Sequence, residues 1–459
     1  MHLMTFPTLP TLNELLNPQL QPESVRVQAD ASTDLLDPIH LFDMTWKPGG
    51  GGVKHLVLPQ ALTGVAAPIV VMTANHFPTG SHKVGPAFSC LREGLLSGEL
   101  SVDGSTLVFP STGNYGIGGA WVGPRVGFRS LVVLPEEMSA ERFEMIRGFG
   151  AEIIATPGSE SNVKEIYDKV AELRQIPHNR ILNQFEDFGN YRFHHFVTGN
   201  SALDLAAELA QKGVGKGRIA AFVSAMGSAG TIAAGDRIRQ ENSELKTVGL
   251  EPVQCPTLFN VGYGAHAIEG IGDKHVTWIH NVRAMDLLIC IDDQQCLEGL
   301  RLLQAGSEYL QGDLGLDADE CDQLADTFGV SGICNILGAI RTARYYNFGA
   351  DQPVFTVATD GFDRYPSVLN RLDNQKGRLD GGGAGRTLGY FLDPSREMEL
   401  EGSESVRRRW HNQKYFSWVE QLGKSLDELE ALWEPQFWEE QGAGVERLDA
   451  AAIDRRETT

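Results

Sequence analysis

The sequence predicts an α/β fold in which helices cover a mostly parallel β-sheet. From about residue 65 to residue 370, short apolar runs of strand length alternate with amphipathic segments of helical length. Apolar runs without polar alternation are typical of strands buried on both faces, as in parallel sheets. Their alternation with helices indicates crossover connections between parallel strands. The predicted strands cover residues 68–72, 106–109, 130–134, 152–155, 219–223, 248–250, 287–291 and 354–357, and the predicted helices include 139–149, 161–175, 201–212 and 294–310.

Length and charge limit the class of protein. A chain of 459 residues, 42% of them hydrophobic, can bury a large core and form about two or three domains. The formal net charge is −21, and an acidic surface repels nucleic acids and anionic membranes. No apolar run reaches the ~18 residues of a membrane helix. We therefore expect neither nucleic acid nor membrane among the partners.

The six cysteines form no Cys-x-x-Cys pair and no close cluster with histidine. This spacing predicts free thiols in a reducing compartment and no metal site. The N-terminus lacks a basic region followed by an apolar stretch, so we expect no secretory signal and a cytoplasmic location.

Two changes in composition divide the chain. Residues 1–60 contain scattered prolines and the run Gly49–Gly52, which predicts an irregular segment with a flexible loop, packed on the larger domain. Residues 61–370 form the core. Residues 371–459 begin with a glycine-rich stretch, 381–385, interpreted as a linker, and continue as a tryptophan-rich extension with helices at 404–420 and 425–433. The extension either packs on the main body or serves as a dimer contact or a lid.

Two glycine-rich loops, at residues 108–119 and 221–231, join a predicted strand to a helix. Glycines allow close approach of an anion, and the N-terminus of the following helix offers free N–H groups, so each loop can hold a phosphate or a carboxylate. A tight turn without a ligand is the alternative. Dinucleotide binding is disfavoured, because neither loop shows a clean Gly-x-Gly-x-x-Gly followed by an acidic residue ~20 positions later.

A lysine follows the turn after the strand at 68–72, within the segment Phe77–Gly85. A solvated surface position is one interpretation of Lys83. The other is a buried amine of lowered pKa, which can form an imine with an aldehyde cofactor. The order of Lys83, an asparagine-containing glycine loop and a second glycine loop favours the latter, because the carboxyl ends of parallel strands meet at one edge.

The motifs resemble those of fold-type II pyridoxal-phosphate (PLP) enzymes, above all the cysteine synthase and cystathionine β-synthase family. That family carries Ser-x-Lys, Thr-Ser-Gly-Asn-Thr-Gly, Asn-Gln-Phe and Gly-Thr-Gly-Gly-Thr. The corresponding segments are Ser81-His82-Lys83, Ser111-Thr112-Gly113-Asn114-Tyr115-Gly116, Asn183-Gln184-Phe185 and Gly227-Ser228-Ala229-Gly230-Thr231. The resemblance covers about residues 65–370 and implies two open, mostly parallel sheets flanked by helices, with the smaller domain at about 100–200, and a homodimer.

The resemblance also implies a role for each matching residue. Lys83 would form the Schiff base with PLP and move the α-proton of an amino-acid substrate. Asn114 would hydrogen-bond the ring hydroxyl of the cofactor. The phosphate would be bound by Gly227, Ser228, Ala229, Gly230 and Thr231, and the substrate by Ser111, Thr112, Gly113, Tyr115 and Gln184.

Departures from the family pattern leave the identity of the amino-acid substrate undetermined. Val84-Gly85 follows the lysine where the family has Asp-Arg, and His82-Lys83 is closer to the tryptophan synthase β-subunit. Tyr115 replaces a threonine. At the last strand, Asp360 aligns with the family's serine that meets the pyridine nitrogen, or Thr359 does so with a shift.

The expected activity is β-elimination or β-replacement on a cysteine- or serine-like amino acid through an aminoacrylate intermediate. Alternatives are a serine or threonine ammonia-lyase, a catalytically silent binding protein that keeps the fold, and a nicotinamide-binding enzyme.

Overall fold

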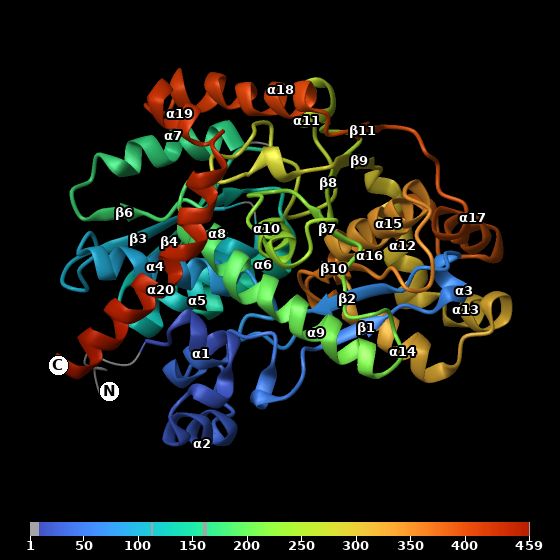
Figure 1. Ribbon diagram of the computed structural model, residues 1–459, viewed down its shortest axis with the longest axis horizontal. Coiled ribbons are helices and arrows are strands. Elements are labelled where there is room, and N and C mark those ends of the chain that lie inside the picture. The colour runs from blue at the N-terminus through green and yellow to red at the C-terminus, as the bar shows by residue number, and fades with distance from the viewer. Residues whose placement is uncertain (1–8, 112, 159–162, 459) are drawn as a thin grey trace.

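Two β-sheets organise the chain, as the resemblance implied (Figure 1). The computed structural model describes residues 9–111, 113–158 and 163–458. The first sheet has seven strands, of which the inner five are parallel and the two edge strands antiparallel. In spatial order they are β1 (His55–Val57), β2 (Ile69–Thr73), β10 (Val354–Ala358), β7 (Ala221–Ala225), β8 (Lys246–Pro252), β9 (Leu287–Ile291) and β11 (Glu399–Glu401).

The second sheet has four parallel strands. Every strand predicted from the sequence lies in one of the two sheets, within a few residues of the predicted bounds. Three short strands, β1, β6 and β11, were not predicted. The order in the second sheet is β5 (Glu152–Thr156), β4 (Arg129–Pro135), β3 (Thr106–Pro110) and β6 (Asn179–Ile181).

Helices connect and cover the strands. The four helices predicted between strands are confirmed, although the segment 294–310 breaks at Gly306 into two helices. The first part of the chain contains α1 (Leu12–Leu16), η1 (Pro18–Leu20), α2 (Glu23–Ala31), η2 (Pro38–Asp43), η3 (Pro48–Gly50), α3 (Gln60–Thr63), α4 (Val84–Ser97), α5 (Asn114–Val126), α6 (Ala140–Gly148), α7 (Val163–Arg174), α8 (Phe188–Phe193), η4 (His194–Thr198), α9 (Gly199–Gln211) and α10 (Ala233–Glu241). The remainder contains α11 (Thr257–Asn260), η5 (Val282–Ala284), α12 (Asp293–Ala305), α13 (Ser307–Leu314), α14 (Ala318–Thr327), α15 (Val330–Tyr345), η6 (Phe362–Arg364), α16 (Pro366–Lys376), α17 (Gly381–Leu392), α18 (Glu404–Lys414), η7 (Tyr415–Val419), α19 (Leu426–Ala431) and α20 (Pro435–Thr458).

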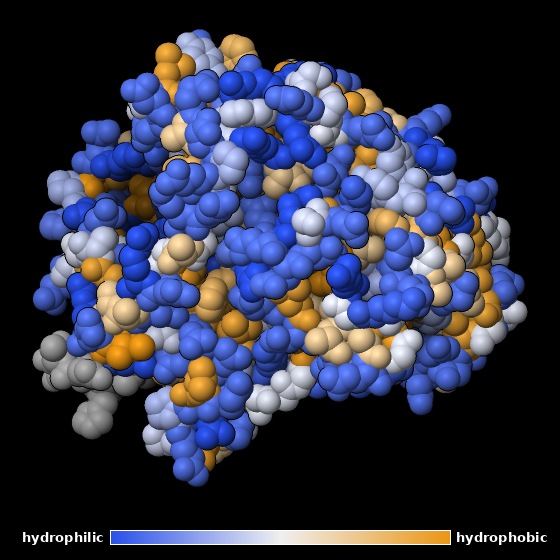
Figure 2. Space-filling model, in the orientation of Figure 1, coloured by the Kyte–Doolittle hydropathy of each residue, from blue (hydrophilic) through white to orange (hydrophobic). Residues whose placement is uncertain are grey.

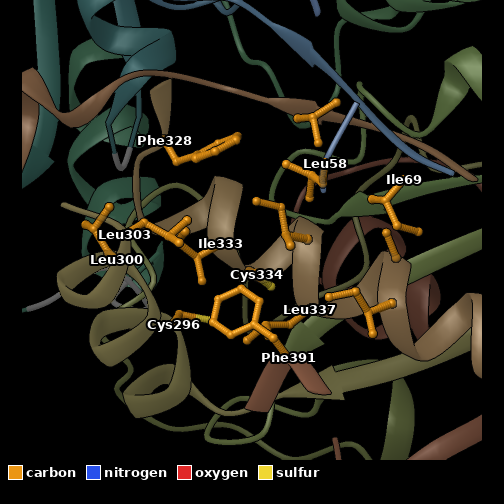
Figure 3. Close-up of a cluster of buried hydrophobic side chains, with 14 of the residues drawn as sticks. Leu58, Ile69, Cys296, Leu300, Leu303, Phe328, Ile333, Cys334, Leu337 and Phe391 are labelled. Atoms are coloured by element: carbon orange, nitrogen blue, oxygen red, sulfur yellow. The ribbon is translucent and has the colours of Figure 1, made fainter. Parts of the chain in front are cut away.

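The glycine-rich stretch at 381–385 is not a linker. It forms the first turns of α17, where the Asp380 side chain caps the helix by accepting a hydrogen bond from the Gly383 amide. Phe391 at the other end of α17 is fully buried among residues of α12 and α15 (Figure 3). Burial of the apolar face of α17 offsets the low helix propensity of its glycines.

The N-terminal segment is more regular than predicted. It contains the helices α1 and α2 and ends in strand β1. The side chains of Leu12 and Leu15 are fully buried in a cluster that also contains residues of α4 and α5. The N-terminal segment is therefore part of the packed structure.

The C-terminal extension packs on the main body (Figure 1). Strand β11 pairs with β9 and completes the first sheet. Helix α18 buries Trp410, whose indole N–H donates to the Leu258 carbonyl oxygen. Helix α20 then runs along α8 and reaches α4 and α1. The predicted helices at 404–420 and 425–433 are confirmed in position, whereas α20 was not predicted.

Hydrophilic residues dominate the surface face drawn in Figure 2, with hydrophobic residues in small separate groups. This agrees with the charged, acidic composition. Among the described residues, no helix is both long enough and apolar enough to cross a membrane. All six cysteines are buried, with free thiols.

Candidate active site

Six connections meet where the two sheets face each other, each following the carboxyl end of a parallel strand, β2, β3, β6, β7, β8 or β10, and the start of α15 joins them. Ligands bind at this edge in open α/β sheets. The loops enclose one cavity, whose lining comes from both sheets and includes most of the residues named from the sequence. It is lined by Lys83, Ser111, Gly113, Asn114, Tyr115, Gln184, Ala225, Gly227, Ala229, Gly230, Thr231, Gly270, Ile271, Ser331 and Thr359.

Lys83 lies at the start of α4 and points its amine across the cavity to the loop after β7. Its Nζ donates a hydrogen bond to Ser228 Oγ at 3.3 Å. Burial lowers the pKa of Lys83 to about 8, and the carboxylate of Asp273 opposes this shift. A lysine of lowered pKa has an appreciable neutral fraction near pH 7, which is the form that attacks a carbonyl group.

The loop from Gly227 to Thr231 has the close packing expected of an anion cradle at the start of α10. A side chain at Gly227 would lie 2.6 Å from the Gly270 carbonyl oxygen, and one at Gly230 would lie 2.0 Å from Asn190 Oδ1. Ala229 adopts a left-handed backbone conformation, with φ of 59°. Ser228 Oγ also accepts a hydrogen bond from Asn190 Nδ2. The backbone conformation at Ala229 and the hydrogen bond from Asn190 to Ser228 thus fix the shape of the loop.

The loop after β3 is organised by Ser111. Its Oγ accepts hydrogen bonds from the amides of Gly113 and Gly116, at 3.0 and 2.8 Å, and so caps the start of α5. Gly113 lines the cavity, and a side chain there would lie 2.6 Å from Arg142 Nη1. Thr112, expected to bind the substrate, lies outside the described residues.

Gln184 and Tyr115 line the same cavity. The Gln184 carbonyl oxygen accepts a hydrogen bond from Asn190, which fixes the Gln184 backbone beside the loop after β7. The Tyr115 ring packs against Phe109, and burial raises the pKa of its phenol. The phenol is therefore neutral and contributes to the wall of the cavity.

Asp360 and Thr359 are the two residues that the sequence offers for the contact with the pyridine nitrogen. The Asp360 carboxylate is fully buried and accepts hydrogen bonds from Asn114 Nδ2 at 2.6 Å and from the Tyr365 hydroxyl at 3.0 Å. Thr359, the alternative from the sequence, lines the cavity together with Ser331. Asp360 thus contacts the cavity-lining residue Asn114, whereas Thr359 lines the cavity itself.

Three residues at the site were not picked out from the sequence. Arg142 contacts Asn114, Asn190 contacts the loop after β7, and Asp273 interacts electrostatically with Lys83. Arg142 and Asp273 belong to no motif of the resemblance. Asn190 lies in the segment 183–199, whose match to the family was the one available signal.

These features define a class of protein. A lysine amine of lowered pKa faces a glycine-rich loop at a helix start, and a side chain at Gly227 or Gly230 of this loop would clash with neighbouring atoms. An aldehyde cofactor with a phosphate group fits this combination, with its aldehyde at Lys83 and its phosphate at the loop. The site is that of a PLP-dependent enzyme.

Comparison with known families supports this class of enzyme. The model of the family described as pyridoxal-phosphate dependent enzyme matches residues 53–310, so the chain belongs to that family. The cysteine synthase of Staphylococcus aureus is 29% identical over 319 residues, which are 69% of this chain and 94% of the relative. Cystathionine β-synthase of Saccharomyces cerevisiae is 30% identical over 264 residues, covering 56% and 51%.

Solved structures share the fold. The cysteine synthase of Entamoeba histolytica superimposes with a TM-score of 0.61 at 22% identity, over 75% of this chain and 94% of that chain. A hydrogen sulfide-producing enzyme of Fusobacterium nucleatum gives a TM-score of 0.57 at 21% identity, over 68% and 95%. The cysteine synthases and the sulfide-producing enzyme are thus covered almost to their full length and the yeast cystathionine β-synthase to about half, while part of this chain extends beyond each match.

Proposed function

We propose that the protein is a PLP-dependent lyase or transferase that carries out β-elimination or β-replacement on a cysteine- or serine-like amino acid. The observation that carries this proposal is the Lys83 amine, which lies in one cavity with the loops of Asn114, Gln184 and Gly227–Thr231. Relatives named cysteine synthase and cystathionine β-synthase support the type of reaction.

Each residue has a task in this proposal. Lys83 would hold the cofactor covalently, and its amine would take the α-proton of the substrate. The loop from Gly227 to Thr231 binds the phosphate. When bound, PLP supplies an electron sink for the charge left on the α-carbon. The hydroxyl groups of Ser331 and Thr359, which line the cavity, would be available to its ring nitrogen.

The substrate is held by the loop after β3. Its carboxylate binds at the start of α5, where backbone amides and the helix dipole favour an anion, beside Gly113 and Gln184. Ser111 supports this site by capping the loop, because its Oγ is already engaged with backbone amides. This arrangement aligns the substrate with the Lys83 amine.

The covalent attachment is tested by reducing the purified holoenzyme with borohydride and mapping the labelled peptide by mass spectrometry. We expect the label on Lys83 and its loss in Lys83→Arg, which keeps the charge but cannot form the link. The exposed Lys216→Arg is the matched control, because Lys216, whose side chain is 72% exposed, pairs with Asp351 at the surface. Absence of label, or label elsewhere, would refute the assignment.

The reaction is tested by product analysis with L-cysteine, O-acetyl-L-serine, L-serine and L-threonine, each with and without sulfide. Pyruvate with ammonia and sulfide from L-cysteine indicates elimination, whereas L-cysteine formed from O-acetyl-L-serine and sulfide indicates replacement. Turnover of only L-serine or L-threonine to the keto acid would favour an ammonia-lyase. A holoenzyme that converts none of these amino acids would count against the proposal.

We further propose a homodimer located in the cytoplasm, in line with the resemblance. Sedimentation of the purified holoenzyme measures the first point. A monomer at micromolar concentration would contradict it.

A further inference from the structure

The guanidinium group of Arg142 is buried at the junction of the two sheets. Its Nε donates to Glu269 Oε2 at 2.5 Å, its Nη1 to Asn114 Oδ1 at 3.1 Å and its Nη2 to the Tyr365 hydroxyl at 3.0 Å. Arg142 Nη2 also lies 3.8 Å from Asp360 Oδ2. A cation so enclosed is stable only because carboxylates balance its charge.

The Asn114 amide lies between a hydrogen-bond donor, the Arg142 guanidinium group, and a hydrogen-bond acceptor, the Asp360 carboxylate. A guanidinium group donates hydrogen bonds and accepts none, whereas an ionised carboxylate accepts and donates none. Arg142 therefore contacts the carbonyl end of the amide, and Asp360 accepts from its NH2 end at 2.6 Å. The two neighbours leave the amide a single satisfied orientation, because the flipped amide would place N–H against guanidinium and C=O against carboxylate.

The orientation matters for the cavity that Asn114 lines. The NH2 group has a second hydrogen after the one given to Asp360, while the carbonyl oxygen is engaged by Arg142. The amide can thus offer the cavity a donor. A donor suits an anionic ring oxygen of the cofactor, and an acceptor would repel it.

We propose that Arg142 and Asp360 are a positioning pair that holds the Asn114 amide with its NH2 group toward the cofactor. The inference rests on the proposed function only in placing the ring of PLP beside Asn114. Arg142 and Asn114 follow strands of the four-stranded sheet, and Asp360 follows β10 of the seven-stranded sheet. The orientation is therefore set only when the elements of the two sheets are packed together.

The decisive test is the exchange of the two side chains in the double variant Asn114→Asp with Asp360→Asn. The exchange keeps the net charge, keeps a carboxylate beside Arg142 and allows the hydrogen bond between positions 114 and 360 to form again. Residue 114 then has no donor. We expect the thermal unfolding temperature to recover relative to Asn114→Asp alone, while the affinity for PLP stays about 10-fold or more below wild type and its absorbance spectrum stays altered.

Two variants of Arg142 give a second measurement that does not depend on the double variant. Lysine can only donate, so Arg142→Lys should retain the orientation, whereas the glutamine of Arg142→Gln can donate or accept and leaves Asp360 alone to orient the Asn114 amide, which is then held less firmly. We expect PLP affinity close to wild type for the first and about 10-fold weaker for the second. Glu141→Gln is the control, because Glu141 bonds to Ser367 across the same junction.

The outcomes separate the explanations. Full recovery of PLP affinity and spectrum in the exchanged variant would overturn the proposal, since pairing alone would then suffice. Equal losses in Glu141→Gln and Arg142→Gln would also overturn it, because packing of the junction would then be the cause. Borohydride labelling of every variant distinguishes the proposed PLP site from the proposed positioning pair. If the wild-type protein carries no label at Lys83, the PLP site itself is refuted. If all variants carry normal label and bind PLP with normal affinity, only the positioning pair is refuted.

Discussion

At the scale of single residues, the buried carboxyl group of Asp273 interacts electrostatically with the Lys83 amine. Asp273 is 7% exposed, and its Oδ2 has no hydrogen-bond partner among the described residues. Burial raises the pKa of Asp273 to about 7, and the Lys83 ammonium opposes the shift. The two groups titrate close together, so each charge stabilises the other near neutral pH.

The replacement Asp273→Asn should change how the cofactor-free protein captures PLP. The neutral amine is the reactive form, so the capture rate should rise with pH through the pKa of Lys83, about 8, and then level off. Removing a carboxylate that favours the ammonium form lowers this pKa, so the midpoint should move to lower pH. Stopped-flow absorbance across pH 6 to 10 measures it, with the exposed Asp351→Asn as control; a midpoint that stays or rises would contradict the coupling.

Residues in contiguous motifs could be predicted from the sequence, and residues that reach the site from elsewhere could not. Lys83, Asn114 and the loop at Gly227 stand beside glycines that mark their loops. Arg142 lies on a helix whose charged residues give the same pattern as a solvent-facing side. Its role depends on the packing of α6 against the segment after β10, which no local pattern encodes.

At the scale of elements, strands buried in the sheet interiors were predictable because apolar runs mark them. Strand β6 is only partly buried, and the three-residue edge strands β1 and β11 are likewise not fully buried, so their sequences carry little signal. Helix α17 was missed for the opposite reason. Its glycines disfavour a helix in isolation, and the buried residues Leu388 and Phe391 on its inner face decide the outcome.

Helix α20 holds the extension in place through Asp449. Its carboxylate accepts hydrogen bonds from the amides of Leu12 and Asn13 and from Arg92 Nη2 at 2.5 Å. Asp449→Ala leaves the buried Arg92 without its partner, which typically costs about 3 to 5 kcal/mol. Urea unfolding should show this loss.

The control for Asp449 is the exposed ion pair of Arg129 and Glu152, whose side chains are 72% and 64% exposed. Glu152→Gln should change the free energy of unfolding by less than about 1 kcal/mol. Similar effects of the two variants would show that the contact made by α20 contributes little.

At the scale of the whole molecule, the cysteines report on the integrity of the fold. All six are buried, and burial raises the pKa of the thiols of Cys90, Cys255 and Cys296. Buried neutral thiols react slowly. We expect an aromatic disulfide reagent at pH 8 to modify almost none of them in the native protein and all six in denaturant; one fast-reacting thiol in the native protein would contradict the packing described.

The bond from the Leu12 amide to Asp449 joins positions 437 residues apart and bears on how the protein is made. Helix α1 leaves the ribosome well before Asp449 and, with five residues, is too short to persist alone. The carboxylate that completes its first turn is synthesised 437 residues after Leu12. Helix α1 is therefore completed only after Asp449 has been translated, and the growing chain must keep the apolar residues of α1 from other contacts until then.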